Sequence, residues 1–377
     1  MDVSKIRLDK IKNSLVFCLV VTYLILSFLP NDEITFGAIG LILLSLFTLC
    51  NFVKIKEIFL YFFVAYLIMF LVSKSFWLPG YDTKDIISSL LFFSLIPSLF
   101  HSLSHSYENT ILLGITTFWF FLCFTICFWG LESGIDFQRS TIFNIPYLHK
   151  NGVATFIEMG YVVTLFSGKN KKIISKFFIF MLCSISLLFV GSKTAILLVT
   201  FISLFSAERL SSLFFLVPRL LITFLLLLFL FIEQIYEVLV NVENLYTASL
   251  RFVLWDKALS DVLVSYISFI FGIGPGNFEV SELKIGGLEL IDSPHNYILS
   301  ILNSYGLLGL VVFGVYFLYI FSLSKQKNIL NTYFFLAYML FFLHSLFDVG
   351  WVKGSGFFIA MITGLMFIKN EKNIIHQ

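Results

Sequence analysis

The sequence predicts an all-α polytopic membrane protein that forms a single transmembrane domain over residues 1–377. Hydrophobic residues make up 59% of the chain and charged residues only 13%, whereas soluble domains carry about 25% charged residues. Apolar runs recur along the chain, and several reach the roughly 20 residues that a helix needs to cross a hydrocarbon core of about 30 Å. The runs are continuous and do not alternate with polar residues, which excludes a transmembrane β-barrel.

Twelve apolar segments are expected to cross the membrane as helices. The first follows a basic stretch, is longer than a signal-peptide core of about 7–15 residues and lacks a small-residue cleavage site, so we expect a retained span. All five cysteines lie inside apolar runs, which favours small buried side chains over disulfides or metal ligands. In chain order the segments cover residues 13–29, 34–53, 57–73, 86–103, 109–130, 151–168, 173–190, 194–207, 212–235, 295–322, 329–348 and 354–368.

The distribution of lysine and arginine predicts the orientation of these spans. An even number of spans places both termini on one side. Sixteen of the 25 basic residues flank the span ends on that side, and basic residues favour the cytoplasm. We therefore expect cytoplasmic termini. The nine basic residues expected outside are Lys74, Lys84, Arg139, Lys150, Lys193, Arg251, Lys257, Lys284 and Lys353.

The longest loop, residues 236–294, lies on the expected outer side. Loops of this length are uncommon without a function. Its segment "TASLRFVLWDKALSDVLVSY" (247–266) has apolar residues at helical spacing, which predicts an amphipathic helix on or near the membrane surface. Arg251 and Trp255 are four residues apart on one face, so the indole can position the guanidinium. Arg251 then contacts solvent or lipid phosphate, or it clamps a substrate phosphate through two hydrogen bonds.

A glycine-rich segment, "FGIGPGNF" (271–278), follows this helix. It lacks the strand–helix context of a dinucleotide site. Gly272, Gly274 and Gly276 instead predict a tight structural turn whose backbone approaches a ligand or another helix.

The segment "SPHN" (293–296) stands where the long loop returns to the bilayer. Serine is favoured as a helix cap and proline at the first helical position, so we expect Ser293 to cap, Pro294 to open the helix and His295 to lie in the first turn. A helix start attracts anions. His295 is therefore either a capping residue without chemistry or a group that acts on a substrate.

Further polar residues lie at the expected outer ends of other spans. Each alone is typical of a snorkelling or helix-end residue, but together they predict an outward cationic cluster. At the expected cytoplasmic ends of the spans, His101 and His105 have no carboxylate residue nearby in the sequence, so we expect no metal site there. No Asp-x-Asp motif is present, which argues against a metal-dependent nucleotide-sugar transferase. The outer residues are Arg139, His149, Lys150, Asn151, Lys193, Asp348, Trp351 and Lys353.

The order of these motifs resembles the O-antigen polymerase and O-antigen ligase family. The resemblance covers residues 190–355 and rests on "SLRFVLWDKAL", "FGIGPGNF", "SPHNYILSILNSYGLLGLVVF" and "HSLFDVGW", while "HKNG" (149–152) is similar to exopolysaccharide polymerases. It implies a GT-C-like helical fold in the bacterial inner membrane, with an outward cavity roofed by the long loop. The implied substrate is an undecaprenyl-diphosphate-linked oligosaccharide, without metal, cofactor, nucleotide sugar or nucleic acid.

The resemblance also implies roles for individual residues. Arg251 would hold the diphosphate of the lipid donor, and His295 would act as general base on the acceptor sugar in an inverting transfer. The remaining cluster would bind the diphosphate or the glycan. Implied partners are membrane lipids, a flippase and a chain-length regulator. The binding residues would be Lys150, Asn151, Arg139, Lys193, Trp255, Asn296, Asp348 and Lys353.

Three functions remain open at this point. Ligases of the family usually carry arginine where this chain has Lys193, and lysine lacks the bidentate fork. This difference and "HKNG" favour a polymerase over a ligase that transfers the glycan to lipid A–core. A lipid-linked oligosaccharide flippase is the third candidate, but the chain shows no internal repeat and its ionisable residues gather at the expected outer face.

Overall fold

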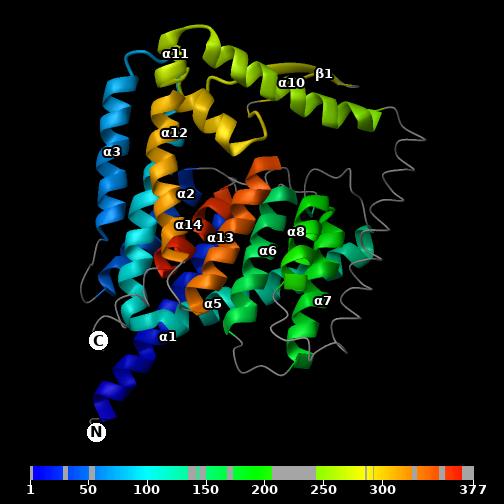
Figure 1. Ribbon diagram of the computed structural model, residues 1–377. Coiled ribbons are helices and arrows are strands. Elements are labelled where there is room, and N and C mark those ends of the chain that lie inside the picture. Colours follow the sequence, from blue (N-terminus) through cyan, green and yellow to red (C-terminus); the bar gives the residue numbers. More distant parts are fainter. Residues whose placement is uncertain are drawn as a thin grey trace.

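The computed structural model describes a helical bundle with a layer of helices and strands across one end (Figure 1). Three described helical stretches are long and apolar enough to cross a membrane, namely Asp9–Ser27, Thr83–Ser133 and Tyr297–Ser322. Shorter apolar helices cover Ala38–Thr48, Glu57–Ser73, Lys176–Val190 and Leu336–Leu346. The described residues are 3–28, 33–50, 56–134, 142–143, 150–167, 173–205, 243–284, 287–291, 293–324, 329–347 and 353–366.

The first part of the bundle consists of α1 (Val3–Ser27), α2 (Glu33–Thr48) and α3 (Glu57–Ser73), followed by one continuous helical stretch. This stretch comprises α4 (Thr83–Leu90), the π-helical turn η1 (Leu91–Leu95) and α5 (Ile96–Ser133).

The continuous stretch replaces the two separate spans expected at 86–103 and 109–130. A straight helix of its 51 residues would be roughly 76 Å long, far more than the hydrocarbon core of about 30 Å. It bends at Tyr107, whose φ of −128° and ψ of 19° are not helical. The bend divides the stretch into two lengths that each suit a bilayer.

The second part contains α6 (Lys150–Ser167), α7 (Ile173–Val190), α8 (Lys193–Phe205), α13 (Ile329–Phe347) and α14 (Lys353–Met366). Helix α6 lies in the centre and packs against α5, α7, α13 and α14. Its contact with α5 is close because Trp119 Nε1 donates to the Ile157 carbonyl at 2.8 Å. A Cβ on Gly160 would come within 2.3 Å of the Trp119 ring. Residues 206–242, which include the expected span 212–235, lie outside the described residues.

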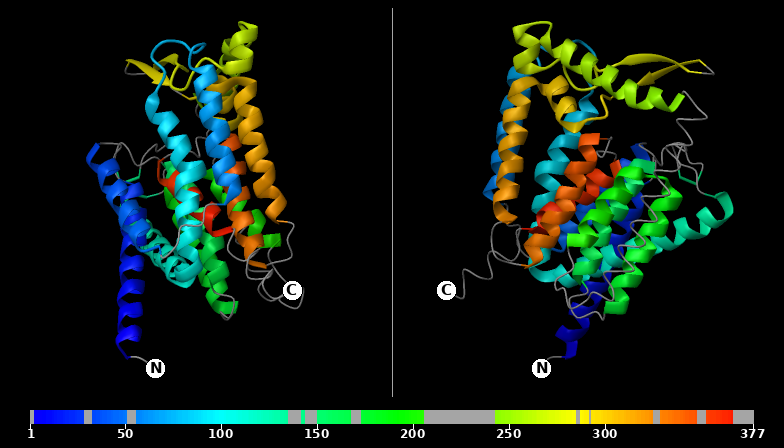
Figure 2. Two further views of the ribbon diagram at one scale, coloured as in Figure 1. Left: turned by 90° about the vertical axis from the view of Figure 1, so that its left-hand side faces the viewer. Right: turned by 45° about the vertical axis from the view of Figure 1, so that its right-hand side comes forward.

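The layer across the end contains α10 (Glu243–Leu263), α11 (Tyr266–Phe271) and an antiparallel hairpin of β1 (Val280–Lys284) and β2 (Gly287–Ile291) (Figure 2). It lies at the end of the molecule opposite the start of α1 (Figure 1). The helix expected at 247–266 corresponds to α10, which begins four residues earlier and ends at Leu263. Ser265 caps the next helix, α11, because its Oγ accepts from Ser268 N at 3.0 Å.

The hairpin was not expected from the apolar runs that predict the spans. In its sequence "VSELKIGGLELI" (280–291), apolar and polar residues alternate over 282–285 and 288–290, on either side of a Gly–Gly pair. That pattern is typical of a β-hairpin.

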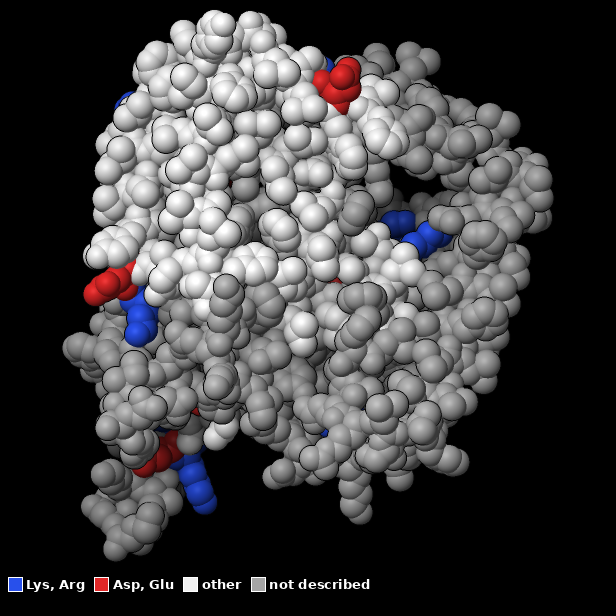
Figure 3. All heavy atoms as spheres, in the orientation of Figure 1, with Lys and Arg blue, Asp and Glu red and all other residues white. Residues whose placement is uncertain are grey.

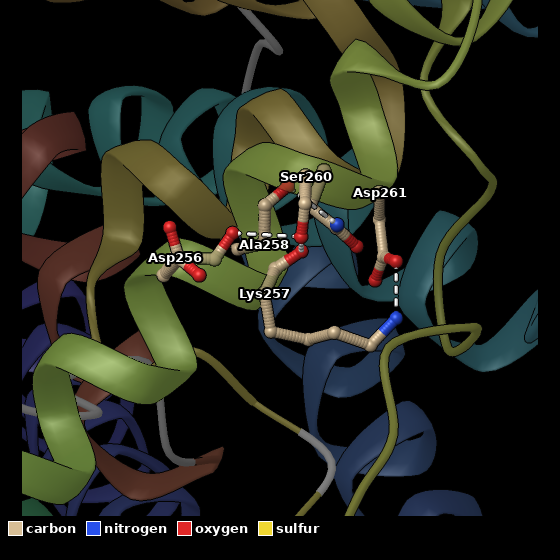
Figure 4. A network of polar contacts seen from close by, with 6 residues as sticks. Asp256, Lys257, Ala258, Ser260 and Asp261 are labelled. Atoms are coloured by element: carbon tan, nitrogen blue, oxygen red, sulfur yellow. Dashed lines mark hydrogen bonds and ion pairs between the residues drawn. The ribbon is translucent and has the colours of Figure 1, made fainter.

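Helix α10 is amphipathic. Leu254, Ala258 and Val262, at helical spacing, are buried. Beside this face, Lys257 and Asp261 form an ion pair (Figure 4). Ser260 Oγ on the exposed face donates to the Asp256 carbonyl at 2.9 Å (Figure 4). The buried face of α10 is therefore apolar, whereas the exposed face mixes polar side chains with the large apolar side chains of Phe252, Val253, Leu259 and Leu263.

Helix α12 (Tyr297–Ser324) is broken at Gly306, whose φ is +65°. Its first piece lies beneath α10, and the longer second piece runs beside α3 (Figures 1 and 2). A Cβ on Gly306 would lie 2.4 Å from the Ile270 carbonyl oxygen and 2.5 Å from Gly272 N. The span expected at 295–322 corresponds to the apolar helix Tyr297–Ser322, but this helix is kinked at Gly306, where the chain after α11 meets α12 backbone to backbone.

Candidate functional site

The start of α12 differs from the expected arrangement. The helix begins at Tyr297, so the expectation that Pro294 opens it with His295 in the first turn is wrong. Asn296 is the cap instead, because its Oδ1 accepts from Leu299 N at 3.1 Å.

His295 precedes this cap with a backbone φ of +51°. A non-glycine residue in the left-handed region is uncommon. Among the described residues, only Phe143 is another such case. The backbone N–H of His295 donates to Ser293 Oγ at 3.3 Å, and its side chain is half-buried.

Asn296 also connects two helices. Its Nδ2 donates to the carbonyl of Leu346 at 3.0 Å, in the last turn of α13. The start of α12 is thereby attached to the end of α13. Asp348, expected in the site two residues further on, lies outside the described residues.

The glycine-rich turn lies between two parts of the bundle. Gly272, Gly274 and Gly276 have φ values of +76°, +97° and +79°. Ile273 N donates to the Asn303 carbonyl of α12 at 2.8 Å. On the opposite side Leu78 N, in the connection between α3 and α4, donates to the Ile273 carbonyl at 3.0 Å. The turn approaches a helix, and its glycines permit that close contact.

Helix α10 carries Arg251 and Trp255 above the first piece of α12. The side chain of Arg251 is not among those described, and its backbone places it one helical turn before Trp255. Trp255 is half-buried and packs on the small cluster of Leu254, Ala258 and Phe278. Asn303 Nδ2 donates to the Ala258 carbonyl at 3.3 Å, which joins α12 to α10.

Two helix starts bring basic residues to the same end. Lys150 and Asn151 begin α6, and Lys193 begins α8. These starts lie below the α10 layer (Figure 1), and basic side chains are seen in a hollow of this face (Figure 3). Lys150 and Lys193 are both half-buried.

Several residues of the expected cluster are undescribed in part or whole, and His149 and Trp351 are among those outside the described residues. Arg139 lies outside the described residues, and Lys353 begins α14 with its side chain outside the description. Of the expected cluster, the structure therefore brings His295, Asn296, Trp255, Lys150, Asn151 and Lys193 to one end of the bundle.

The sequence prediction missed an ionisable pair inside the bundle. His344 Nδ1 of α13 lies 3.0 Å from Glu158 Oε1 of α6, and both side chains are 0% exposed. This buried pair is an exception to the expectation that ionisable residues gather at the outer face. A signal was present, because ionisable residues within apolar spans are rare and often functional.

The opposite end of the bundle has a histidine pair but no metal-site geometry. His101 is buried, and its ring centroid lies 5.0 Å from that of His105. Within the described parts of the chain, no group of three histidine, cysteine or acidic residues is placed to hold a metal ion.

Comparison with protein-family models gives no match to this chain, and comparison with the curated proteins gives none either.

Proposed function

We propose that this protein is an integral membrane glycosyltransferase that polymerises a surface polysaccharide. Its substrates are oligosaccharide repeat units linked to undecaprenyl diphosphate, and the reaction is an inverting transfer without a metal ion. The proposal rests on the order of motifs in residues 190–355 and on the place of His295 in the fold.

One observation carries the proposal. His295, chosen from the sequence as the base, has a left-handed backbone with φ +51°. It lies where the start of α12 and the end of α13 are joined by Asn296. Strained conformations at non-glycine residues persist where the surroundings enforce them and cluster at functional sites. The helix starts with Lys150 and Lys193 lie at the same end of the bundle.

The chemistry assigns one role to each group. The acceptor hydroxyl attacks the anomeric carbon of the donor and forms the new C–O bond, while His295 accepts the hydroxyl proton. The bond from the anomeric carbon to the diphosphate oxygen breaks, and undecaprenyl diphosphate leaves. Arg251 holds that diphosphate, and Lys150 and Lys193 offset its growing negative charge.

The proposal includes a membrane topology. Twelve spans place both termini in the cytoplasm of a bacterium, and the α10 layer lies outside the inner membrane. The opposite positions of the start of α1 and the α10 layer support this topology, as does the bend at Tyr107.

The test uses purified protein in lipid vesicles with an undecaprenyl-diphosphate-linked repeat unit as the only substrate. Mass spectrometry should detect a ladder of longer lipid-linked chains. His295→Ala and Arg251→Ala should each abolish the ladder while the protein still inserts and folds. Full activity in either variant contradicts the role of that residue.

Matched controls separate the site from general effects of substitution. His105→Ala removes an exposed histidine at the opposite end of the bundle, and Lys257→Ala removes an exposed cation of α10. Both should keep the ladder. If folded wild-type protein makes no ladder but transfers the glycan to added lipid A–core, the enzyme is a ligase. If it does neither, the proposed glycosyl transfer is wrong.

A further inference from the structure

The pair of Glu158 and His344 has no role in the proposed chemistry. Glu158 lies two turns inside α6, about 12 Å along the helix axis from Lys150. Both side chains are fully buried, and Glu158 Oε2 has no hydrogen-bond partner among the described residues. Burial of ionisable groups within a membrane protein is unfavourable and usually serves a function.

The pair is connected to the candidate site through α13. His344 precedes Leu346 by two residues, and the Leu346 carbonyl accepts from Asn296 Nδ2 at 3.0 Å. Asn296 is the neighbour of His295. Two successive contacts therefore lead from α6 to His295, first between Glu158 and His344 at 3.0 Å and then between Leu346 and Asn296.

Helix α6 is the fixed partner in this arrangement. Trp119 of α5 donates to the Ile157 carbonyl, and Gly160 packs against the same indole. These contacts lie on either side of Glu158 in the sequence. The position of Glu158 is thus set by α5, and Glu158 in turn can set the position of α13.

We propose that Glu158 and His344 are positioning residues that fix the axial position of α13 relative to α6. Through α13, they thereby hold His295 above the starts of α6 and α8. For its effect on catalysis, this inference rests on the proposed polysaccharide polymerase function. Its structural part can be tested without substrate.

Hydrogen exchange read by mass spectrometry tests the structural part on the full-length protein. Glu158→Ala and His344→Ala should increase exchange in the peptide covering residues 293–300 relative to the wild type. Glu158→Gln should stay close to the wild type, because an amide can still form the hydrogen bond with the imidazole. Unchanged exchange in both alanine variants, or equal exchange in Glu158→Gln and Glu158→Ala, overturns the proposal.

Ser186→Ala is the matched control for loss of a buried contact between helices. Ser186 Oγ donates to the carbonyl of Cys123 in α5 at 3.2 Å and to that of Leu182 at 2.7 Å. These hydrogen-bond partners lie in α5 and α7, so exchange in residues 293–300 should not change. If Ser186→Ala increased hydrogen exchange in residues 293–300 as much as Glu158→Ala does, the increase would reflect a general loss of stability. That result would overturn the positioning role of Glu158.

Turnover supplies a second measurement. In vesicles, Glu158→Ala and His344→Ala should lower kcat by about tenfold or more, because misplacement by about 1 Å can cost about 100-fold. KM for the lipid-linked repeat should stay within about twofold, because the pair does not contact substrate. The double variant should be no slower than the slower single variant. A raised KM with unchanged kcat contradicts the proposal.

Two further outcomes remain informative. If Glu158→Ala does not fold, the double variant Glu158→His with His344→Glu swaps the two residues and should restore the contact between them. Hydrogen exchange in residues 293–300 of this variant should then be close to that of the wild type. Increased exchange in that folded variant overturns the inference. If the wild-type protein forms no polymer, the proposed function fails, and the exchange measurements still decide the positioning role.

Discussion

At the scale of single residues, the two hydrogen bonds of Asn296 can be separated by substitution. Asn296→Asp keeps an oxygen that accepts from Leu299 N but removes the donor to Leu346, whereas Asn296→Ala removes both. A side-chain cap contributes about 1 kcal/mol to helix stability. Exchange at the Leu299 amide should therefore stay slow in Asn296→Asp and become fast in Asn296→Ala.

Both Asn296 variants should extend chains more slowly than the wild type, because both lose the contact with α13. Asn296→Asp with wild-type turnover would show that the contact with Leu346 does not matter for the reaction. Equal Leu299 exchange in the two variants would show that Asn296 is not the cap.

Lys193 gives a second prediction at this scale. If it neutralises diphosphate as a point charge, Lys193→Arg keeps that charge and Lys193→Ala removes it. In the vesicle assay we expect a partial loss of chain extension in Lys193→Ala and a smaller loss in Lys193→Arg. Equal activity of wild type, Lys193→Arg and Lys193→Ala would remove Lys193 from the site.

The sequence is enough to predict that several polar residues gather at one end of the bundle. It is less informative about the hydrogen bonds and helix caps that hold them there. Ser293 and Pro294 fit a helix start, but the true cap is Asn296, whose Oδ1 accepts from Leu299 N and whose Nδ2 donates to Leu346 of α13, 50 residues away in the chain. Glu158 and His344 are separated by 186 residues in the chain. Local patterns could mark each as unusual, but only the fold shows that they meet.

At the scale of elements, the break in α12 should depend on Gly306. A side chain there would need a φ of +65° and would press against the backbone of Ile270 and Gly272. Gly306→Ala should therefore lower the thermal unfolding midpoint in detergent and detach the α10 layer from α12. Faster hydrogen exchange in residues 272–278 would report that detachment.

Gly314→Ala is the control on the same helix. A Cβ at this position meets nothing within 4 Å, and alanine is favoured over glycine in a helix by up to about 1 kcal/mol. This variant should be as stable as the wild type or slightly more stable. If both variants lower the midpoint equally, the close contact at Gly306 does not explain the break.

The apolar runs predict the helices of this bundle because each span is a local, continuous pattern. The expected span 173–190 coincides with α7 (Ile173–Val190), and 57–73 coincides with α3. The break at Gly306 could not be predicted in the same way, because "NSYGLLGL" continues the apolar pattern. It results from the turn at Gly272, which is 34 residues earlier in the chain and meets α12 only in the folded protein.

At the scale of the whole molecule, the proposed function requires the α10 layer to face outward. In the expected topology, lysine and arginine favour this orientation, with sixteen on the side of the termini and nine on the other side. Two exposed serines mark the two ends, because Ser260 lies on the exposed face of α10 and Ser106 lies next to the bend at Tyr107. The substitutions Ser260→Cys and Ser106→Cys are chemically matched and differ only in place.

A membrane-impermeant maleimide should label Ser260→Cys in cells whose inner membrane is intact, and Ser106→Cys only after lysis. The parent protein measures the background from its five native cysteines. The opposite result would place His295 and its neighbours in the cytoplasm. Repeat units presented at the outer face could not reach that site, so the opposite result would reject the proposed polymerase even if the helical fold stands.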